Sequence, residues 1–193
     1  MPRNDTIRTY LFFISLVTIC TISAVSAASV KNTQKTDVFF TLNGFGSSGS
    51  DMEGMSNQAV GFGWVARGGV RMNRLGLFVE AQRDIWLATE TDVKLVNGVF
   101  NLGIGAHVIW INGRLKSTIS TGTSTLAFDT IFDTAGTTGI YLDVHPTVLR
   151  WPLAKRITLE LSPFGATLLI PAVSDPMLKR LEYRTTLGVE VTF

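Results

Sequence analysis

The feature that most constrains this 193-residue sequence is a period of two in its apolar residues, which returns eight times between residue 37 and the last residue. The pattern is clearest in residues 99–110, where apolar side chains at even positions alternate with Asn101, Gly103, Gly105 and His107. Successive side chains of a β-strand point to opposite faces, so this period is typical of strands with one apolar and one polar face. The sequence therefore predicts an all-β fold.

The period of two gives the approximate range of each strand. The predicted strands lie near residues 37–46, 61–72, 74–87, 99–110, 114–121, 140–145, 156–162 and 181–193. The phase is weak in the first range, where both faces are mixed. Pro146 cannot donate a backbone hydrogen bond, so it predicts a bulge or a break in pairing where it follows the sixth range.

The connections between these ranges alternate in length. Residues 72–74, Asn112-Gly113 and residues 151–155 are predicted as tight turns. Longer polar segments lie between them, at residues 46–57, 88–97, 127–138 and 171–180. Strict alternation of short and long connections predicts an eight-stranded antiparallel up-and-down barrel, with both ends of the mature chain at the short-turn end.

The first 27 residues have the pattern of a secretory signal peptide. Arg3 and Arg8 precede an apolar run from residue 10 to residue 22, and small residues ending in Val25-Ser26-Ala27 follow. This pattern predicts a cleaved signal peptide at residues 1–27 and a single domain at residues 28–193. The only cysteine, Cys20, lies in the signal peptide, so the mature chain is expected to hold no disulfide and no cysteine metal site. Cys20 as a lipoprotein acceptor is the weaker alternative.

Periodicity alone does not say which face of the barrel points outward. A secreted soluble barrel would enclose a ligand with its apolar face, whereas a transmembrane barrel turns that face to lipid. The polar face carries both signs of charge together with many glycines, which suits a narrow lumen filled by paired side chains. We therefore predict a transmembrane β-barrel. Its expected lumenal charge network comprises Arg67, Arg71, Glu80, Asp84, Asp143, His145, Glu160, Glu182, Arg184 and Glu190.

Aromatic residues near the strand ends support a membrane location. Tryptophan and other aromatic side chains gather at both interfaces of a membrane barrel. The residues expected in these aromatic belts are Trp64, Trp86, Trp110, Trp151 and Phe193.

The last strand carries the most specific signal. Tyr183, Leu187, Val189, Val191 and the terminal Phe193 lie on one face. This stretch resembles the C-terminal assembly signal of bacterial outer-membrane β-barrel proteins, and the whole chain is similar in architecture to the small eight-stranded class exemplified by OmpA, OmpX and OmpW. The resemblance implies a Gram-negative outer membrane, contact with its lipid and lipopolysaccharide, and recognition of the last strand by the barrel-assembly machinery.

The sequence leaves several functions open. We expect a structural or interaction role through the surface loops, with an unknown protein partner, no cofactor, no metal and no enzymatic activity. The alternatives are a narrow porin-like pore or route for small apolar solutes, and a lipid A-modifying enzyme. Asp143 and His145 lie on one face as an acid and histidine pair, but the sequence lacks a His-x-Ser spacing that would resemble the deacylases. A net charge of +2 gives no reason to expect nucleic acid.

Overall fold

A computed structural model of the protein describes residues 36–51, 59–87, 96–128, 138–170 and 180–193. Its elements are β1 (Thr36–Asp51), β2 (Ala59–Met72), β3 (Leu75–Leu87), β4 (Val96–Trp110), the short 3-10 helix η1 (Ile111–Gly113), β5 (Leu115–Phe128), β6 (Thr138–Ala154), β7 (Ile157–Ile170) and β8 (Arg180–Thr192). No helix within these residues is long and apolar enough to cross a membrane. The predicted signal peptide at residues 1–27 lies outside the described residues.

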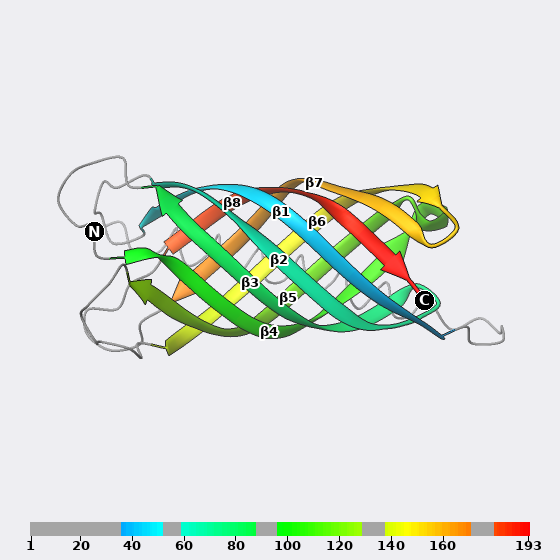
Figure 1. The fold of residues 1–193 in the computed structure, drawn as a ribbon, viewed down its shortest axis with the longest axis horizontal. Coiled ribbons are helices and arrows are strands. Elements are labelled where there is room, and N and C mark those ends of the chain that lie inside the picture. Colours follow the sequence, from blue (N-terminus) through cyan, green and yellow to red (C-terminus); the bar gives the residue numbers. More distant parts are fainter. Residues whose placement is uncertain (1–35, 52–58, 88–95, 129–137, 171–179) are drawn as a thin grey trace, which may run out of the picture. The chain divides into compact units, whose positions relative to one another are not determined.

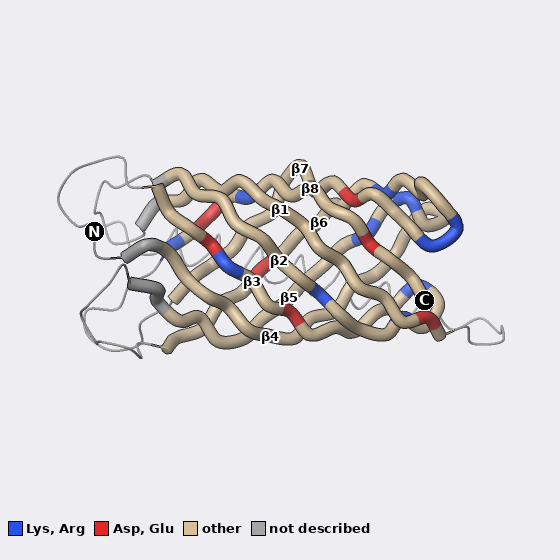
Figure 2. The backbone as a smooth tube through the Cα atoms, viewed as in Figure 1, with Lys and Arg blue, Asp and Glu red and all other residues tan. Residues whose placement is uncertain are grey.

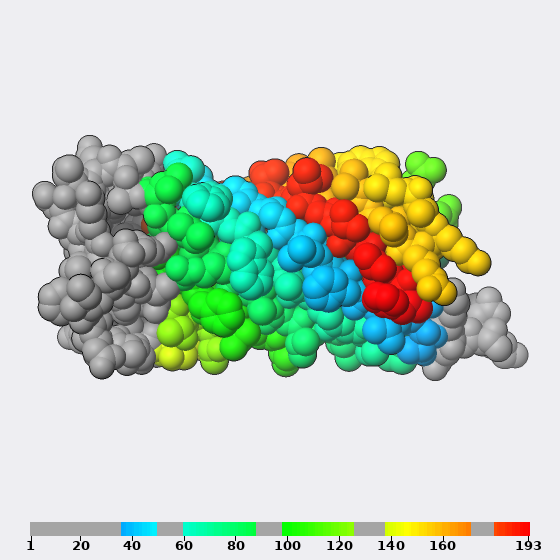
Figure 3. All heavy atoms as spheres, viewed as in Figure 1, coloured from blue at the N-terminus to red at the C-terminus, as the bar shows by residue number. Residues whose placement is uncertain are grey.

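The eight strands form a closed barrel in chain order, as predicted (Figure 1). Each strand pairs antiparallel with the next, and β8 closes the barrel by pairing with β1 from Phe39 with Thr192 to Asp51 with Arg180. The space-filling view shows β8, in red, filling the seam beside β1, in blue (Figure 3). Closure leaves no strand edge, so the backbone groups of each strand can bond within the wall, as a segment in lipid requires.

The apolar face points outward and the polar face points into the lumen, as predicted for a membrane barrel. Val79 and Ile104 expose 64% and 66% of their surface on the outside of the wall. Glu182 and Glu190 are fully buried inside it. This distribution excludes the soluble alternative, in which the apolar face would surround a ligand.

Two bulges shift the strand phase where β6 meets β7. Between Val144 and Thr147 the pairing with β7 shifts by one residue, and a second shift lies between Ser162 and Gly165 on the side facing β8. Because a bulge inserts an extra residue, His145 and Val148 both face the lumen. The bulge predicted at Pro146 is confirmed, but the strand continues beyond it to Ala154.

Several predicted boundaries were wrong. The turn expected at residues 151–155 begins later, because Trp151 and Pro152 still pair with β7 and only Lys155 and Arg156 form the turn. A loop was expected from residue 46, but β1 continues to Asp51, because its Gly- and Ser-rich end pairs with β2 and β8. The cross-strand partners extend these strands where the local sequence gives little strand signal.

The turn predicted at Asn112-Gly113 is confirmed. Asn112 and Gly113 have φ of 54° and 87°, in the left-handed region that asparagine and glycine tolerate best. Asn73 has φ of 56° in the turn between β2 and β3. These two turns and the turn at Lys155-Arg156 lie at one end of the barrel, which we call the short-turn end. The strands are joined at the opposite, long-loop end by segments outside the described residues.

Candidate functional site in the barrel lumen

The lumen is filled by charged side chains of both signs. Among the residues that the structure describes, six basic and six acidic side chains are buried inside the wall, and Figure 2 shows both signs distributed along the barrel. The buried set is Arg67, Arg71, Glu80, Asp84, Lys116, Asp143, Arg150, Glu160, Arg180, Glu182, Arg184 and Glu190. Equal numbers of opposite charges allow a narrow lumen to be neutral, which a low-dielectric interior requires.

One group of these residues, the long-loop cluster, is centred on Arg184. The guanidinium of Arg184 lies 3.0 Å from Asp84 Oδ2, 2.8 Å from Glu182 Oε2 and 3.8 Å from Asp143 Oδ1. Glu182 also accepts a 2.7 Å hydrogen bond from Arg180. These contacts join β8 to β3 and β6 across the lumen, so the cluster links strands that are not neighbours in the wall.

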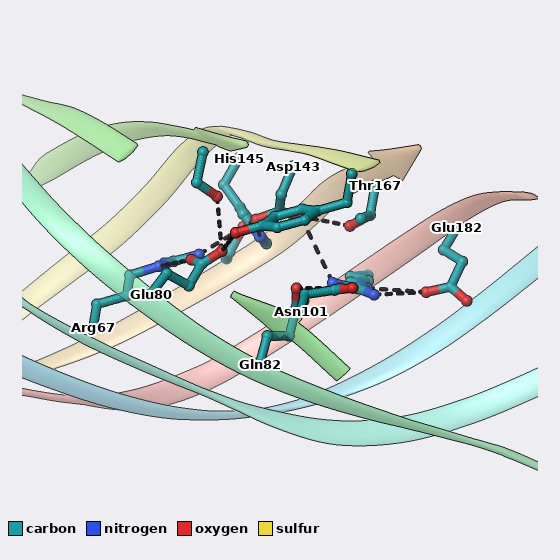
Figure 4. A network of polar contacts seen from close by, with 12 residues as sticks. Arg67, Glu80, Gln82, Asn101, Asp143, His145, Thr167 and Glu182 are labelled. Atoms are coloured by element: carbon teal, nitrogen blue, oxygen red, sulfur yellow. Dashed lines mark hydrogen bonds and ion pairs between the residues drawn. The ribbon is translucent and has the colours of Figure 1, made fainter. Parts of the chain in front are cut away.

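Arg67 extends the long-loop cluster along the lumen (Figure 4). Its guanidinium binds Glu80 Oε2 at 2.5 Å and Asp143 Oδ2 at 3.3 Å. Glu80 Oε1 accepts hydrogen bonds from the Tyr141 hydroxyl at 2.8 Å and from Ser120 Oγ at 2.9 Å. Four strands therefore meet on one carboxylate, and few of its acceptor positions remain free.

A second group, the short-turn cluster, surrounds Glu190. Its Oε1 lies 2.6 Å from both Arg71 Nη1 and Arg150 Nη2, and its Oε2 lies 3.4 Å from Lys116 Nζ. Glu160 pairs with Lys116 and, at 3.1 Å, with Arg150. Lys116 and Arg150 were not in the predicted network, and the structure adds both to it.

Three buried rings, which we call the aromatic layer, lie inside the wall: Phe39, Phe78 and His107. Phe39 and Phe78 contact the ring of His107, with centroid distances of 4.8 Å and 6.1 Å. His107 pairs in register with Thr118, which stands between Lys116 of the short-turn cluster and Ser120 on the inner face of β5. These buried rings occupy part of the lumen.

Asp143, His145 and Ser162 form a hydrogen-bonded row at the bulges. His145 Nε2 lies 3.1 Å from Asp143 Oδ2, and His145 Nδ1 lies 2.9 Å from Ser162 Oγ. A charged carboxylate only accepts, so the nitrogen facing Asp143 carries a proton. This order of acid, histidine and hydroxyl resembles a nucleophilic triad. Ser162 could not be identified from the sequence, because the two bulges set its position opposite His145.

The surroundings of Ser162 fit a structural role better than a nucleophile. Its hydroxyl is fully buried and lies within hydrogen-bond distance of the carbonyl oxygens of Thr147 and Phe164, at 3.3 Å and 3.0 Å. Those carbonyls belong to the irregular part of the wall, where the bulges disturb strand pairing. The hydroxyl has one proton, so it can donate to His145 Nδ1 or to one of these carbonyls. The contacts with His145 and Thr147 join β7 to β6.

The outer face carries four of the five residues predicted for the aromatic belts. Trp64, Trp151 and Phe193 are exposed, and Trp110, also on the outer face, donates a 3.1 Å hydrogen bond to Ser117 Oγ. Trp86 was wrongly assigned. It shares the strand phase of Asp84, packs inside against Val99, Tyr141 and Leu169, and has Arg180 4.4 Å above its ring.

The outward residues predicted as an assembly signal lie along β8. Tyr183, Leu187 and Phe193 are exposed, while Val189 and Val191 are partly covered. The Phe193 amide donates a 2.8 Å hydrogen bond to the carbonyl of Val38. The end of the chain is therefore tied into the wall by its neighbour β1.

No cluster of side chains suited to a metal ion occurs in the described part of the chain. The sequence matches no protein-family profile. It also matches no curated protein.

Several solved structures are similar to this chain. Neisserial surface protein A (NspA) is similar with a TM-score of 0.61 and 16% identity, over 82% of this chain and 99% of that one. Ail of Yersinia pestis gives a TM-score of 0.47 and 14% identity over 82% and 99% of the two chains. The outer membrane protein AlkL gives 0.38 and 14% over 86% and 94%. The chain has the architecture of the small eight-stranded outer-membrane β-barrels.

Proposed function

We propose that this protein is a non-conducting outer-membrane barrel that acts through its surface loops, as a structural or interaction protein. The observation that carries this proposal is the charge-balanced lumen, in which each buried acid of the described strands has a basic partner. An eight-stranded barrel is only wide enough for side chains. An ion crossing this lumen would have to separate buried pairs and pass the aromatic layer.

Conductance in planar lipid bilayers tests the closed lumen. We expect the inserted protein to give no steady current at moderate voltage, while a wide porin inserted in the same way conducts. Insertion is verified by the heat-modifiable gel mobility of protein recovered from the bilayer lipid. A stable, ohmic current from the wild-type protein would contradict the proposal.

A route for small apolar solutes through the wall is the second candidate, and the bulges favour it. The irregular pairing between β6 and β7 places Pro146, Thr147 and Phe164 on the outer surface. Thr147 and Phe164 are register partners, so cysteines at both positions can form a disulfide across the irregular pairing between β6 and β7. If solutes pass here, oxidation of the double-cysteine variant will stop uptake of an apolar dye by vesicles, and reduction will restore it. Equal uptake in both states excludes this route.

We further propose that the barrel has no enzymatic activity. Support comes from the buried position of Ser162 and from the wall carbonyls that lie within hydrogen-bond distance of its hydroxyl. Mass spectrometry of lipid A from cells that express the protein is expected to match that from cells with an empty vector. A change in acylation that disappears in a Ser162→Ala variant would establish an enzyme.

We also propose that export removes residues 1–27 and that the assembly machinery binds the last strand. The apolar outer row on β8 and its terminal aromatic support the second part. N-terminal sequencing of protein from the outer membrane tests the first part, which predicts a mature chain that begins at Ala28. Any other start would move the cleavage site.

A further inference from the structure

The three short turns carry a set of exposed basic residues, which we call the basic rim: Arg74, Arg114, Lys155 and Arg156. Each arginine stands immediately before the first residue of a strand, β3, β5 or β7. No acidic residue occurs in these turns. Figure 2 shows Lys and Arg, in blue, gathered in the turn between β6 and β7.

The backbone fixes the three arginines at equivalent positions. The carbonyl oxygen of each arginine accepts a backbone hydrogen bond from the strand that follows the one it precedes. The donors to Arg74, Arg114 and Arg156 are the amides of Ile109, Arg150 and Thr192, at 2.7 Å, 2.9 Å and 2.9 Å. Their side chains, in contrast, are exposed, and none has an ion-pair partner among the residues that the structure describes. The wall therefore fixes the backbone of these arginines at the barrel end and leaves the charge of their side chains free for a ligand.

Large apolar side chains are exposed in these turns and in the strand residues beside them. Ile111 and Leu153 expose 64% and 63% of their surface, and Phe193 exposes 67% at the same end of the barrel. Such side chains gain free energy at the edge of the hydrocarbon layer, while arginine and lysine reach from that edge to the headgroups. Basic and apolar side chains together fit a lipid surface better than a soluble polyanion.

The two ends of the barrel differ in charge. The segments 52–58, 88–95, 129–137 and 171–179, which join the strands at the long-loop end, contain six acidic and two basic residues. The three short turns contain only the basic rim. The short-turn end is therefore the more positive of the two ends. An anionic lipid attracted by this charge would lie in the leaflet at the short-turn end.

We infer that the basic rim binds the phosphate groups of anionic phospholipids in the leaflet at the short-turn end. Arginine can bind phosphate oxygens with two parallel hydrogen bonds, and its apolar stem can lie along the barrel edge. This inference depends on the barrel crossing a membrane. It does not depend on the proposed role of the loops or on a closed lumen, so conductance and lipid binding can fail independently.

Lipid selectivity tests the inference on the full mature chain. The protein is reconstituted into vesicles of equal parts phosphatidylcholine and phosphatidylglycerol, and spin-labelled forms of both lipids report the fraction held at the barrel. We expect phosphatidylglycerol to be preferred about fivefold at low salt. The preference should fall as salt screens the exposed charges.

Two variants isolate the basic rim. In the variant with Arg74→Gln, Arg114→Gln, Lys155→Gln and Arg156→Gln, the preference should fall to about one. The matched variant with Arg74→Lys, Arg114→Lys and Arg156→Lys keeps the charge and should keep most of the preference. Heat-modifiable mobility verifies that both variants fold.

Two outcomes would overturn the inference: a wild-type protein without lipid preference, or a glutamine variant that keeps the preference unchanged. In the first case, binding of polyglutamate is measured in uncharged detergent. The wild-type protein could then bind polyglutamate and the glutamine variant lose that binding. That result would assign the basic rim to a soluble polyanion.

Discussion

Replacing Glu190 with glutamine tests whether the buried charges stabilise the barrel. Glu190 is fully buried and its carboxylate lies 2.6 Å from two arginines and 3.4 Å from Lys116. Glutamine keeps the shape but removes the charge, and it turns an amide donor toward these cations. Removing one partner of a buried ion pair typically destabilises a protein by about 3–5 kcal/mol. We therefore expect the free energy of unfolding to fall by about 3 kcal/mol or more.

The assay is reversible urea unfolding of the barrel folded in lipid vesicles, followed by tryptophan fluorescence. Thr192→Val is the matched control, because it removes one neutral acceptor 3.3 Å from Arg71 and should cost only about 1 kcal/mol. Adding Arg150→Met to Glu190→Gln removes a stranded cation, so the pair should cost less than the sum of its single changes. A loss below about 1 kcal/mol for Glu190→Gln alone would refute the view that buried charge pairing holds this lumen together.

Three further changes have clear expected results. Gly103→Val would place a side chain against the Tyr141 hydroxyl and the backbone of the neighbouring strand, so the temperature at which the compact gel band disappears should fall markedly. In single-tryptophan variants, brominated lipid should quench Trp64 on the outer face and spare Trp86 in the lumen; equal quenching would contradict the correction made for Trp86. Phe193→Ser should reduce the amount of barrel in the outer membrane of cells but leave refolding in vesicles close to normal, and an equal loss in both would show a defect of stability instead of assembly.

The number of strands, their order and their faces could be predicted because each depends on a repeating local pattern. In a barrel whose apolar face points to lipid, Val79 beside Glu80 and Leu187 beside Thr186 already show which side chain faces outward. Strand ends were harder to place. The Gly- and Ser-rich end of β1 gives no local strand signal, and its pairing depends on partners far away in the sequence.

The contacts inside the lumen could not be predicted from local pattern. Periodicity assigns Arg184 to the polar face but does not choose among its possible carboxylate partners, because that choice depends on the stagger of the barrel. The contact between His145 and Ser162 needs two phase shifts, only one of which Pro146 indicated. Trp86 was wrongly predicted for the outer aromatic belt because it is a tryptophan near a strand end. Its strand phase, which it shares with Asp84, places it inside the barrel.

The pairing of charges across the lumen also has a consequence for how such a chain can diverge. Glu190 contacts residues from β2, β5 and β6, so a mutation of any one of the four leaves the others unbalanced. Viable lineages should therefore replace these residues together, or swap an acid and a base between strands, while the lipid-facing positions drift independently. In an alignment of homologous sequences, the positions of the lumenal residues should show correlated substitutions instead of strict conservation.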